Sequence, residues 1–228
     1  MAAKLEPRFD SNSTRFVGAL GWAAELHAGQ TRKGTNVPYI AHLLGVSSNA
    51  IEYGGGEDEA IAALLHDAPE DCGGRPMLDD IRARFGDVVA DIVEACTDTF
   101  EDPKPEWIVR KTQYVAHLDS ASPAARLVSA SDKLYNASAI LKDYRIIGEA
   151  VFERFKESKW HVLWYYRSMA NKFLAIENNE LNRELRRVVE ELEGLVIAGS
   201  PSHERLSRSR IYHELDAKVA EYKGQSGN

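Results

Sequence analysis

Long apolar runs and cysteine are both scarce in this sequence. Nothing approaches the roughly 18 consecutive apolar residues that a membrane-spanning helix needs, and the opening stretch, MAAKLEPRFDSNSTRF, contains no apolar run of the signal-peptide type. The two cysteines, Cys72 and Cys96, form no CxxC pair, which argues against a disulfide framework. We therefore expect a protein of the reducing cytoplasm that does not span a membrane.

An excess of positive charge is also absent. The formal net charge is −7, and an acidic surface repels nucleic acid, so we expect no nucleic-acid partner. A small anionic substrate is compatible with this charge, because a metal ion and a few local cations can reverse the field inside one cleft. Alternation of the β-strand type persists nowhere, whereas apolar residues recur at helical spacing over most of the chain. The sequence therefore predicts an all-α protein.

Helical periodicity and glycine or proline residues divide the chain into segments. Pro38 suits the first turn of a helix, and the glycines at 54–56 suit its end. We expect helices over 16–27, 38–53, 57–67, 77–86, 87–98, 106–119, 123–142, 147–174 and 178–197. We interpret residues 1–198 as one compact multi-helix domain and 199–228 as a polar C-terminal tail, in which a linker precedes a short helix. The charged segment 178–197 fits a solvated flank better than an interface, and the sequence leaves the oligomeric state open.

One short stretch, ALLHDAPED at 63–71, concentrates groups that bind metals or move protons. His66 and Asp67 end an apolar helical stretch, and Glu70 and Asp71 follow within one helical turn. Neutral imidazoles and ionised carboxylates together suit divalent ions such as Mn²⁺, Fe²⁺ or Zn²⁺. Adjacent residues on a helix point about 100° apart, so His66 and Asp67 can share one ion only at the side or end of the helix. The other ligands must come from elsewhere in the chain.

The candidates for those other ligands are His42, in PYIAHLL, and Asp132, in VSASDKLYN. Both stand in otherwise apolar helical contexts, where an unpaired charge is costly. Each also has a purely structural interpretation, as a hydrogen-bonded core histidine for His42 and as an ion pair with Lys133 or an arginine for Asp132. The remaining histidines have no such company, and we interpret them as structural or surface residues: His27, His117, His161, His203 and His213.

Four blocks of the sequence together resemble one known family. They are HAGQTRKGTNVPYIAHLLGV, AIAALLHDAPED, IRARFGDVVADIVEACTD and ARLVSASDKLYNASAIL, and the likeness runs in order along most of the chain. In this order they resemble the amino-terminal hydrolase domain of the RelA/SpoT-type alarmone enzymes and, more closely, the stand-alone small alarmone hydrolases of the HD phosphohydrolase superfamily. The resemblance implies an all-helical HD-domain bundle that binds one Mn²⁺ and removes the 3′-pyrophosphate from the nucleotide (p)ppGpp, giving GDP or GTP.

The resemblance also implies a role for each matching residue. The implied metal ligands are the four residues already singled out: His42, His66, Asp67 and Asp132. The implied catalytic pair, which supports the attacking water, is Glu70 and Asp71. The implied substrate-binding residues are Arg32, Lys33, Asn136 and Tyr165. These roles are chemically consistent, because a metal lowers the pKa of its bound water and a nearby carboxylate can then take the proton. For the two basic loop residues, the alternative is a solvated surface charge.

Pro69 departs from the family pattern, which has an apolar non-proline residue at this position. Proline disfavours helix at the residue before it and lacks a backbone donor, so we expect the helix to end or kink near Asp67. Spacing alone then does not place Glu70 and Asp71 above the ligands. Two functions besides (p)ppGpp hydrolysis stay open, and only the second of them follows from Pro69. One is hydrolysis of a different phosphorylated nucleotide, such as NADPH, on the same metal core. The other is nucleotide binding with weak or no turnover.

Overall fold

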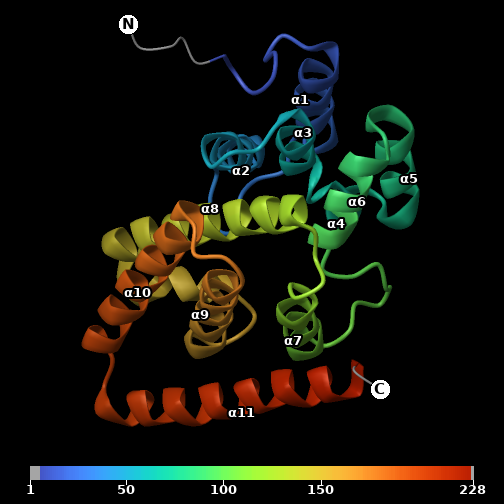
Figure 1. Ribbon diagram of the computed structural model, residues 1–228. Coiled ribbons are helices and arrows are strands. Elements are labelled where there is room, and N and C mark those ends of the chain that lie inside the picture. The colour runs from blue at the N-terminus through green and yellow to red at the C-terminus, as the bar shows by residue number, and fades with distance from the viewer. Residues whose placement is uncertain (1–5, 227–228) are drawn as a thin grey trace, which may run out of the picture. The chain divides into compact units, whose positions relative to one another are not determined.

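The structure is a computed structural model that describes residues 6–226, with side chains as far as residue 221. Over this range the chain is helical and contains no β-strand, which confirms the predicted all-α class. The elements, shown in Figure 1, are α1 (Thr14–Leu26), α2 (Ile40–Glu52), α3 (Glu57–Leu65), α4 (Ala68–Cys72), α5 (Gly74–Phe85), α6 (Asp87–Cys96), α7 (Trp107–His117), α8 (Pro123–Ile147), the 3₁₀ helix η1 (Gly148–Arg154), α9 (Lys159–Ile176), α10 (Glu180–Gly199) and α11 (Ser202–Ser226). None of the described helices is both long enough and apolar enough to cross a membrane.

The chain forms two compact units. The first runs to Phe100 and also includes Ser122–Ser131, and the second comprises Glu101–Ala121 and the chain from Asp132 onwards. The long helix α8 therefore contributes its first part to one unit and its remainder to the other.

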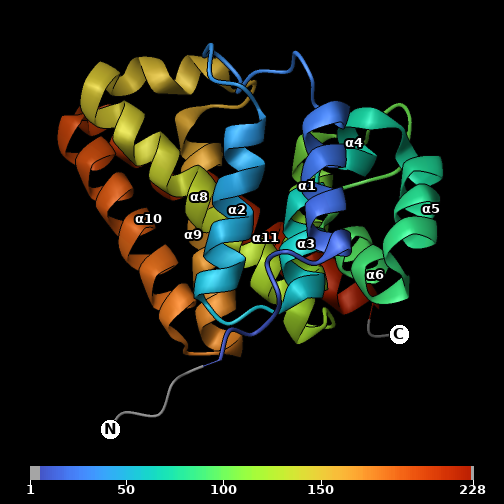
Figure 2. The same cartoon turned by 90° about the horizontal axis from the view of Figure 1, so that it is seen from above.

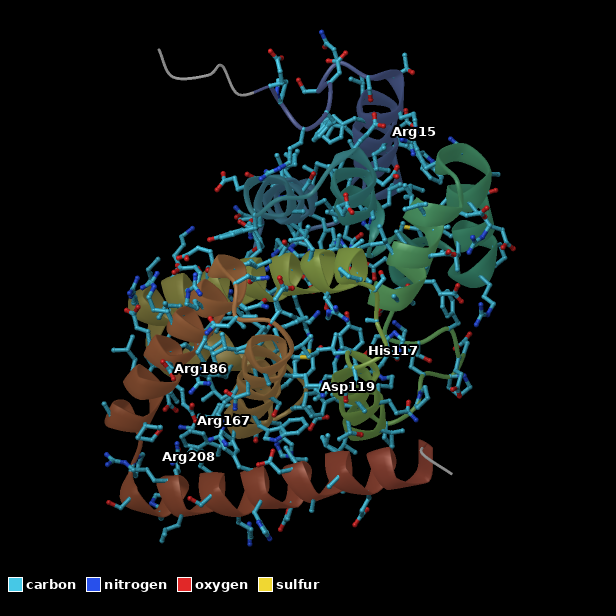
Figure 3. All side chains as sticks on the ribbon, in the orientation of Figure 1. Arg15, His117, Asp119, Arg167, Arg186 and Arg208 are labelled. Atoms are coloured by element: carbon cyan, nitrogen blue, oxygen red, sulfur yellow. The ribbon has the colours of Figure 1, made fainter. Side chains whose placement is uncertain are left out.

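Helix α3 is the centre of the first unit. The residues Ala60–Leu65 are all fully buried, so the helix is covered on every side, as an apolar helix must be. It packs against α1, α2 and α6 (Figures 1 and 2). Its acidic first turn suits the positive end of the helix dipole. Arg15 on α1 (Figure 3) binds Glu57 at 2.5 Å and Asp58 at 2.6 Å, and it donates to Phe85 O at 2.8 Å, which ties α1 to α3 and α5.

Glycines end helices in this unit as the sequence predicts. Gly54 (φ +114°) follows α2, and Gly86 (φ +92°) separates α5 from α6. The start of α2 differs from the prediction, because the helix begins at Ile40 rather than at Pro38. Pro38 instead pairs with Thr31 in an isolated β-bridge, which keeps the end of the preceding loop out of the helix.

Helix α11 belongs to the second unit, where it crosses α7 and α9 (Figure 1). The guanidinium groups of Arg167 and Arg208 (Figure 3) lie 4.7 and 5.5 Å from the centre of the buried Tyr212 ring. Trp164 Nε1 donates to Asp216 Oδ1 at 2.8 Å. Tyr212 and Asp216 thus hold α11 on α9, and the helix extends back from them to Ser202, so the predicted linker at its start is wrong and the segment is helical.

The predicted helix over 147–174 is interrupted. Helix α8 continues to Ile147, beyond the predicted end at 142, and the left-handed Gly148 (φ +60°) then ends it. The 3₁₀ helix η1 follows, and α9 begins only at Lys159. Val151 and Phe152 of η1 are buried, so packing stabilises a turn where helical periodicity predicts continuous helix.

Candidate functional site

Three of the predicted metal ligands lie together in the first unit. His42 comes from α2, and His66 and Asp67 form the turn between α3 and α4. His42 Nε2 lies 3.2 Å and His66 Nε2 lies 3.1 Å from Asp67 Oδ2, and the three groups offer ligand atoms within 4.8 Å of one another. Two ligands bound to one ion at about 2.1 Å are about 3.0 Å apart at a right angle and about 3.4 Å apart in a tetrahedron. The observed separations fit ligands of a single divalent ion.

The backbone selects the form of the His66 ring that suits a metal. His66 Nδ1 lies 2.9 Å from Ala63 O, and because a carbonyl only accepts, Nδ1 carries the proton. In the neutral ring, Nε2 then presents its lone pair toward the Asp67 carboxylate. Two acceptors this close repel one another unless a cation or a second proton compensates, and the rings of His42 and His66 are only 1% and 3% exposed. The donor set therefore fits a divalent cation, with a backbone carbonyl orienting one ligand ring.

Asp67 is held in its ionised form. Burial alone would raise the pKa of Asp67. When the two rings carry a second proton in place of a metal ion, the positive charge of His66 and the hydrogen bonds from both imidazoles more than offset burial and hold the pKa of Asp67 well below its ordinary value. Tyr39 also donates its hydroxyl hydrogen to Asp67 Oδ2 at 2.6 Å. An ionised carboxylate is the form that binds metal.

The predicted helix break before the acidic pair is confirmed. Helix α3 ends at Leu65, and α4 carries Pro69 in its first turn, where a missing N–H is tolerated. Glu70 Oε1 accepts the backbone N–H of Asp98 at 2.6 Å. Asp71 is exposed, and its Oδ2 accepts from the Gln30 side-chain amide at 2.8 Å. The two carboxylates thus have different partners, and their role in supporting a water stays a prediction.

Arg32 and Lys33 lie in a closed loop between α1 and α2. Arg32 N–H donates to Val37 O at 2.8 Å, and the bridge between Thr31 and Pro38 closes the loop next to this bond. Gly34, with φ +69°, makes the turn without the strain that a side chain would add. The Lys33 side chain is exposed, so the loop presents cationic groups that suit phosphate, and their role as substrate ligands stays a prediction.

The other predicted site residues lie in the second unit. Asp132 is buried, forms an ion pair with Lys133, and accepts from Asn136 Nδ2 at 2.5 Å. Burial alone would lower the pKa of Lys133, but the Asp132 carboxylate, with smaller effects of Tyr165 and Tyr114, raises it well above its ordinary value. The structure thus contains the ion pair that the sequence offers as the structural interpretation of Asp132. Its role as a fourth metal ligand stays a prediction.

Tyr165 forms a cluster with cations and aromatic rings in the same unit. The ammonium groups of Lys111 and Lys133 lie 4.9 and 6.0 Å from its ring centre, and the Trp107 ring approaches edge-on at 6.2 Å. Burial raises the pKa of Tyr165 well above its usual value, so the hydroxyl keeps its proton. This buried hydroxyl has no hydrogen-bond partner among the described residues. A buried donor of this kind suits a polar ligand, because it is costly to leave unsatisfied.

Three residues at the site are missing from the predicted site: Tyr39 and Gln30, which contact the predicted acids, and His27, which contacts both of them. Tyr39 reaches Asp67, and Gln30 reaches Asp71. The buried His27, predicted to be structural, places Nδ1 2.7 Å from Gln30 Oε1 and stacks its ring on Tyr39. All three stand in the first of the four family-like blocks, but residue type and spacing do not reveal which side chains meet the acids.

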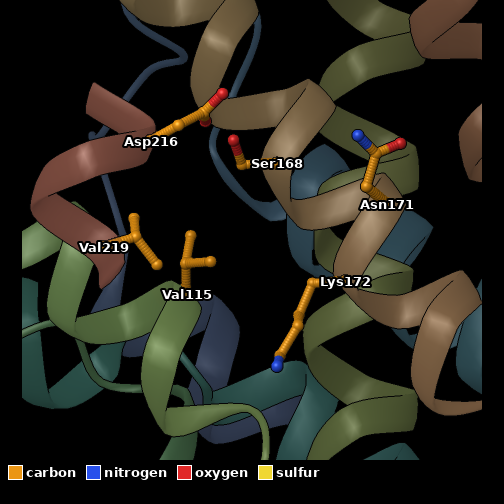
Figure 4. A pocket seen from close by; sticks show the side chains of 6 residues that line it. All are labelled: Val115, Ser168, Asn171, Lys172, Asp216 and Val219. Carbon is orange, nitrogen blue, oxygen red and sulfur yellow. The ribbon is translucent and has the colours of Figure 1, made fainter. Parts of the chain in front are cut away.

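A cavity of about 270 Å³ lies in the second unit (Figure 4), and no predicted site residue lines it. Its lining comes from α7, α9 and α11: Val115, Ser168, Asn171, Lys172, Asp216 and Val219. The charged groups at its wall already have protein partners, because Lys172 pairs with Asp119 and Asp216 accepts the Trp164 indole N–H. The cavity therefore shows no charge that requires a ligand.

The chain is similar to known proteins over more than half of its length. A family profile described as HD domain matches residues 19–151. Guanosine-3′,5′-bis(diphosphate) 3′-pyrophosphohydrolase MESH1 of Xenopus tropicalis is 40% identical over 129 residues, which is 55% of this chain and 69% of the relative. The protein of the same name from Homo sapiens is 38% identical over 129 residues, with the same two shares.

A solved structure extends the likeness to the fold. It is a metazoan ortholog of SpoT that hydrolyzes ppGpp, and it matches with a TM-score of 0.60 and 23% identity over 83% of this chain and 96% of its own. At this identity the match shows the fold alone. The matched family profile and the two sequence relatives show more: this chain belongs to the HD-domain family of metal-dependent phosphohydrolases.

Proposed function

We propose that this protein is a Mn²⁺-dependent (p)ppGpp 3′-pyrophosphohydrolase. The observation that carries the proposal is the cluster of His42, His66 and Asp67, whose ligand atoms are spaced for one divalent ion. This cluster lies in an HD-domain chain that is 40% identical to a guanosine-3′,5′-bis(diphosphate) 3′-pyrophosphohydrolase. Mn²⁺ is proposed from the family resemblance, because imidazole and carboxylate ligands suit several divalent ions.

The three clustered residues would hold the metal. When bound, a divalent ion lowers the pKa of a coordinated water and polarises phosphoryl oxygens. Asp67 supplies the negative charge for this site, and the Ala63 carbonyl keeps the His66 Nε2 lone pair available by binding the proton on Nδ1. The chain therefore presents its ligands in the protonation states that metal binding requires.

The remaining residues act on water and on the substrate's charge. We assign Glu70 and Asp71 to accept the proton of the attacking water, and the Gln30 amide holds the Asp71 carboxylate at 2.8 Å. Arg32 and Lys33 on the closed loop bind the diphosphate oxygens, because a guanidinium and an ammonium are suited to phosphate charge. The Tyr165 hydroxyl in the second unit, which has no hydrogen-bond partner among the residues that the structure describes, supports a role in nucleotide binding.

The proposed reaction balances with water as the only co-substrate. The water oxygen bonds to the phosphorus that is attached to the ribose 3′ oxygen, and the bond between this phosphorus and the 3′ oxygen breaks. One proton of the water passes to a carboxylate, and the 3′ oxygen takes up a proton as it leaves. The products are pyrophosphate with GDP from ppGpp, or with GTP from pppGpp.

A direct assay tests the proposal. The purified chain, supplied with Mn²⁺, is incubated separately with ppGpp, NADPH and a panel of deoxynucleotides, and the products are resolved by anion-exchange chromatography. We expect pyrophosphate and GDP from ppGpp, and loss of this turnover in Asp67→Asn. Asp119→Asn is the matched control, because it makes the same chemical change at an exposed carboxylate that pairs with Lys172, and it should keep wild-type turnover.

Two results would contradict the proposed substrate. Release of phosphate from NADPH without turnover of ppGpp would assign the metal core to a different nucleotide. Binding of ppGpp with no product at any Mn²⁺ concentration would make the chain a nucleotide-binding protein. Glu70→Gln separates chemistry from metal binding, since it should retain Mn²⁺ and lose rate.

A further inference from the structure

The base of the loop that carries Arg32 and Lys33 is joined to the predicted metal centre. Tyr39 N–H donates to Gln30 O at 2.9 Å, so these two residues close the loop through their backbones. The same two residues reach the acids through their side chains. Tyr39 Oη lies 2.6 Å from Asp67 Oδ2, and Gln30 Nε2 lies 2.8 Å from Asp71 Oδ2.

Asp67 needs an external contact to fix its side chain. It occupies the N-cap position of α4, where an aspartate commonly accepts a backbone N–H of its own helix, but here it forms no such bond. Its backbone lies in the turn between two helices, and its carboxylate contacts Tyr39, His42 and His66. The tyrosine hydroxyl is a neutral donor, and it occupies one acceptor site of Oδ2 while other carboxylate lone pairs stay available to a cation.

The Tyr39 ring is itself held on two sides. It stacks on His27 with a centroid distance of 5.0 Å and an interplanar angle of 21°, and it meets His42 edge-on at 5.4 Å. His27 is fixed in turn by Gln30. The Gln30 amide N–H donates to the carboxylate of Asp71, which leaves Gln30 Oε1 to face His27 Nδ1 at 2.7 Å, so Nδ1 is the donor. Tyr39 is thus a rigid donor aimed at the metal ligand.

We propose that Tyr39 is a positioning residue of the metal centre, which orients Asp67 for the ion while its backbone closes the basic loop. This inference rests on the proposed metal site and adds a residue outside the ligand set. Outer contacts that orient metal ligands commonly contribute roughly 10–100-fold to metal affinity. The Tyr39 hydroxyl should therefore raise the affinity for Mn²⁺. The contacts of the ring with His27 and His42 alone should not be sufficient for wild-type affinity.

Calorimetric titration of the purified full chain with Mn²⁺ tests this role without any substrate. Tyr39→Phe keeps the ring and both ring contacts and removes only the hydroxyl, and we expect its Kd for Mn²⁺ to rise roughly 10–100-fold. Gln30→Leu is the matched control at the other side of the loop base. It removes the bonds to Asp71 and His27 but leaves the Tyr39 hydroxyl bond to Asp67, so its Kd should rise much less than that of Tyr39→Phe. Thermal denaturation in EDTA checks that both variants are folded.

The outcomes separate this proposal from the proposed function. An unchanged Mn²⁺ affinity in Tyr39→Phe would overturn the positioning role, and so would an equal loss in Gln30→Leu, because equal losses would indicate a general effect of the loop. Failure of the wild-type chain to bind Mn²⁺ would overturn it as well. Normal binding in the wild type, a weakened Tyr39→Phe and no hydrolysis of ppGpp would support Tyr39 and contradict only the proposed substrate.

Discussion

Thermal denaturation with and without Mn²⁺ measures the predicted metal centre directly. A ligand that binds only the folded state stabilises it by about 2.7 kcal/mol at a hundredfold excess over Kd. In a chain of this size, 1 kcal/mol shifts the melting temperature by about 2–4 °C, so Mn²⁺ should raise the Tm of the wild-type protein by about 5–11 °C over its value in EDTA. The structure predicts that this shift depends on Asp67, because both imidazoles face the same carboxylate oxygen at 3.2 and 3.1 Å.

Asp67→Asn removes the charge and keeps the size of this side chain, so the Mn²⁺-dependent shift should fall below about 2 °C, which corresponds to less than about 1 kcal/mol of binding free energy. Each variant is compared with its own Tm in EDTA, which removes any effect of the substitution on the metal-free protein. Asp71→Asn provides the control, because Asp71 is exposed and bonds Gln30 rather than the imidazoles. A full shift in Asp67→Asn, or none in the wild type, would refute the metal assignment.

Three further substitutions test contacts inside the individual units. Gly55→Ala places a methyl carbon 2.7 Å from Ala50 O, so we expect a loss of about 1–3 kcal/mol in urea denaturation. Lys133→Met removes the buried ion pair between Lys133 and Asp132, and the loss should be about 3–5 kcal/mol at pH 7. Because the folded-state pKa of Lys133 is raised, its stabilising effect is complete below pH 10.5 and is lost as the pH rises through the folded value, so the same comparison at pH 11 should show a smaller difference. Trp164→Phe removes the 2.8 Å hydrogen bond to α11 and should lower the free energy of unfolding by about 1 kcal/mol. Relative to wild type, the hydrogen-exchange rate should increase more in α11 than in α10.

Helix content and most helix ends could be predicted from local signals. The apolar run at the centre of α3 and the glycines before and after the helices of the first unit have direct physical meaning in one sequence. The two larger errors in the predicted helices arise where tertiary packing, and not local sequence, determines the secondary structure. The polar start of α11 is helical because later residues of the same helix, such as Tyr212, are buried against other helices of the second unit. The segment after Gly148 leaves the helix because Phe152 and its neighbours pack as a 3₁₀ turn.

The site could be predicted in its chemistry but only partly in its contacts. The sequence identifies His42, His66 and Asp67 as groups that have little reason to share an apolar context unless they bind something, and the fold brings their ligand atoms together. It gives no indication that Tyr39 and Gln30 reach the acids, because these bonds join residues far apart in the chain and depend on how the loop closes. Local patterns carry residue chemistry, whereas the partners of each side chain are a property of the tertiary structure.

Pro69 illustrates why a departure from a family pattern needs structural interpretation. In a continuous helix the adjacent His66 and Asp67 would diverge by about 100°, but α3 ends at Leu65, and in the turn that follows their ligand atoms are 3.1 Å apart. The proline then occupies the first turn of α4, where no N–H is needed, and Asp71 N–H still donates to Asp67 O at 3.0 Å. The break therefore preserves the one-turn spacing between Asp67 and Asp71. Pro69 by itself gives no physical reason to expect a chain that binds nucleotide without turnover.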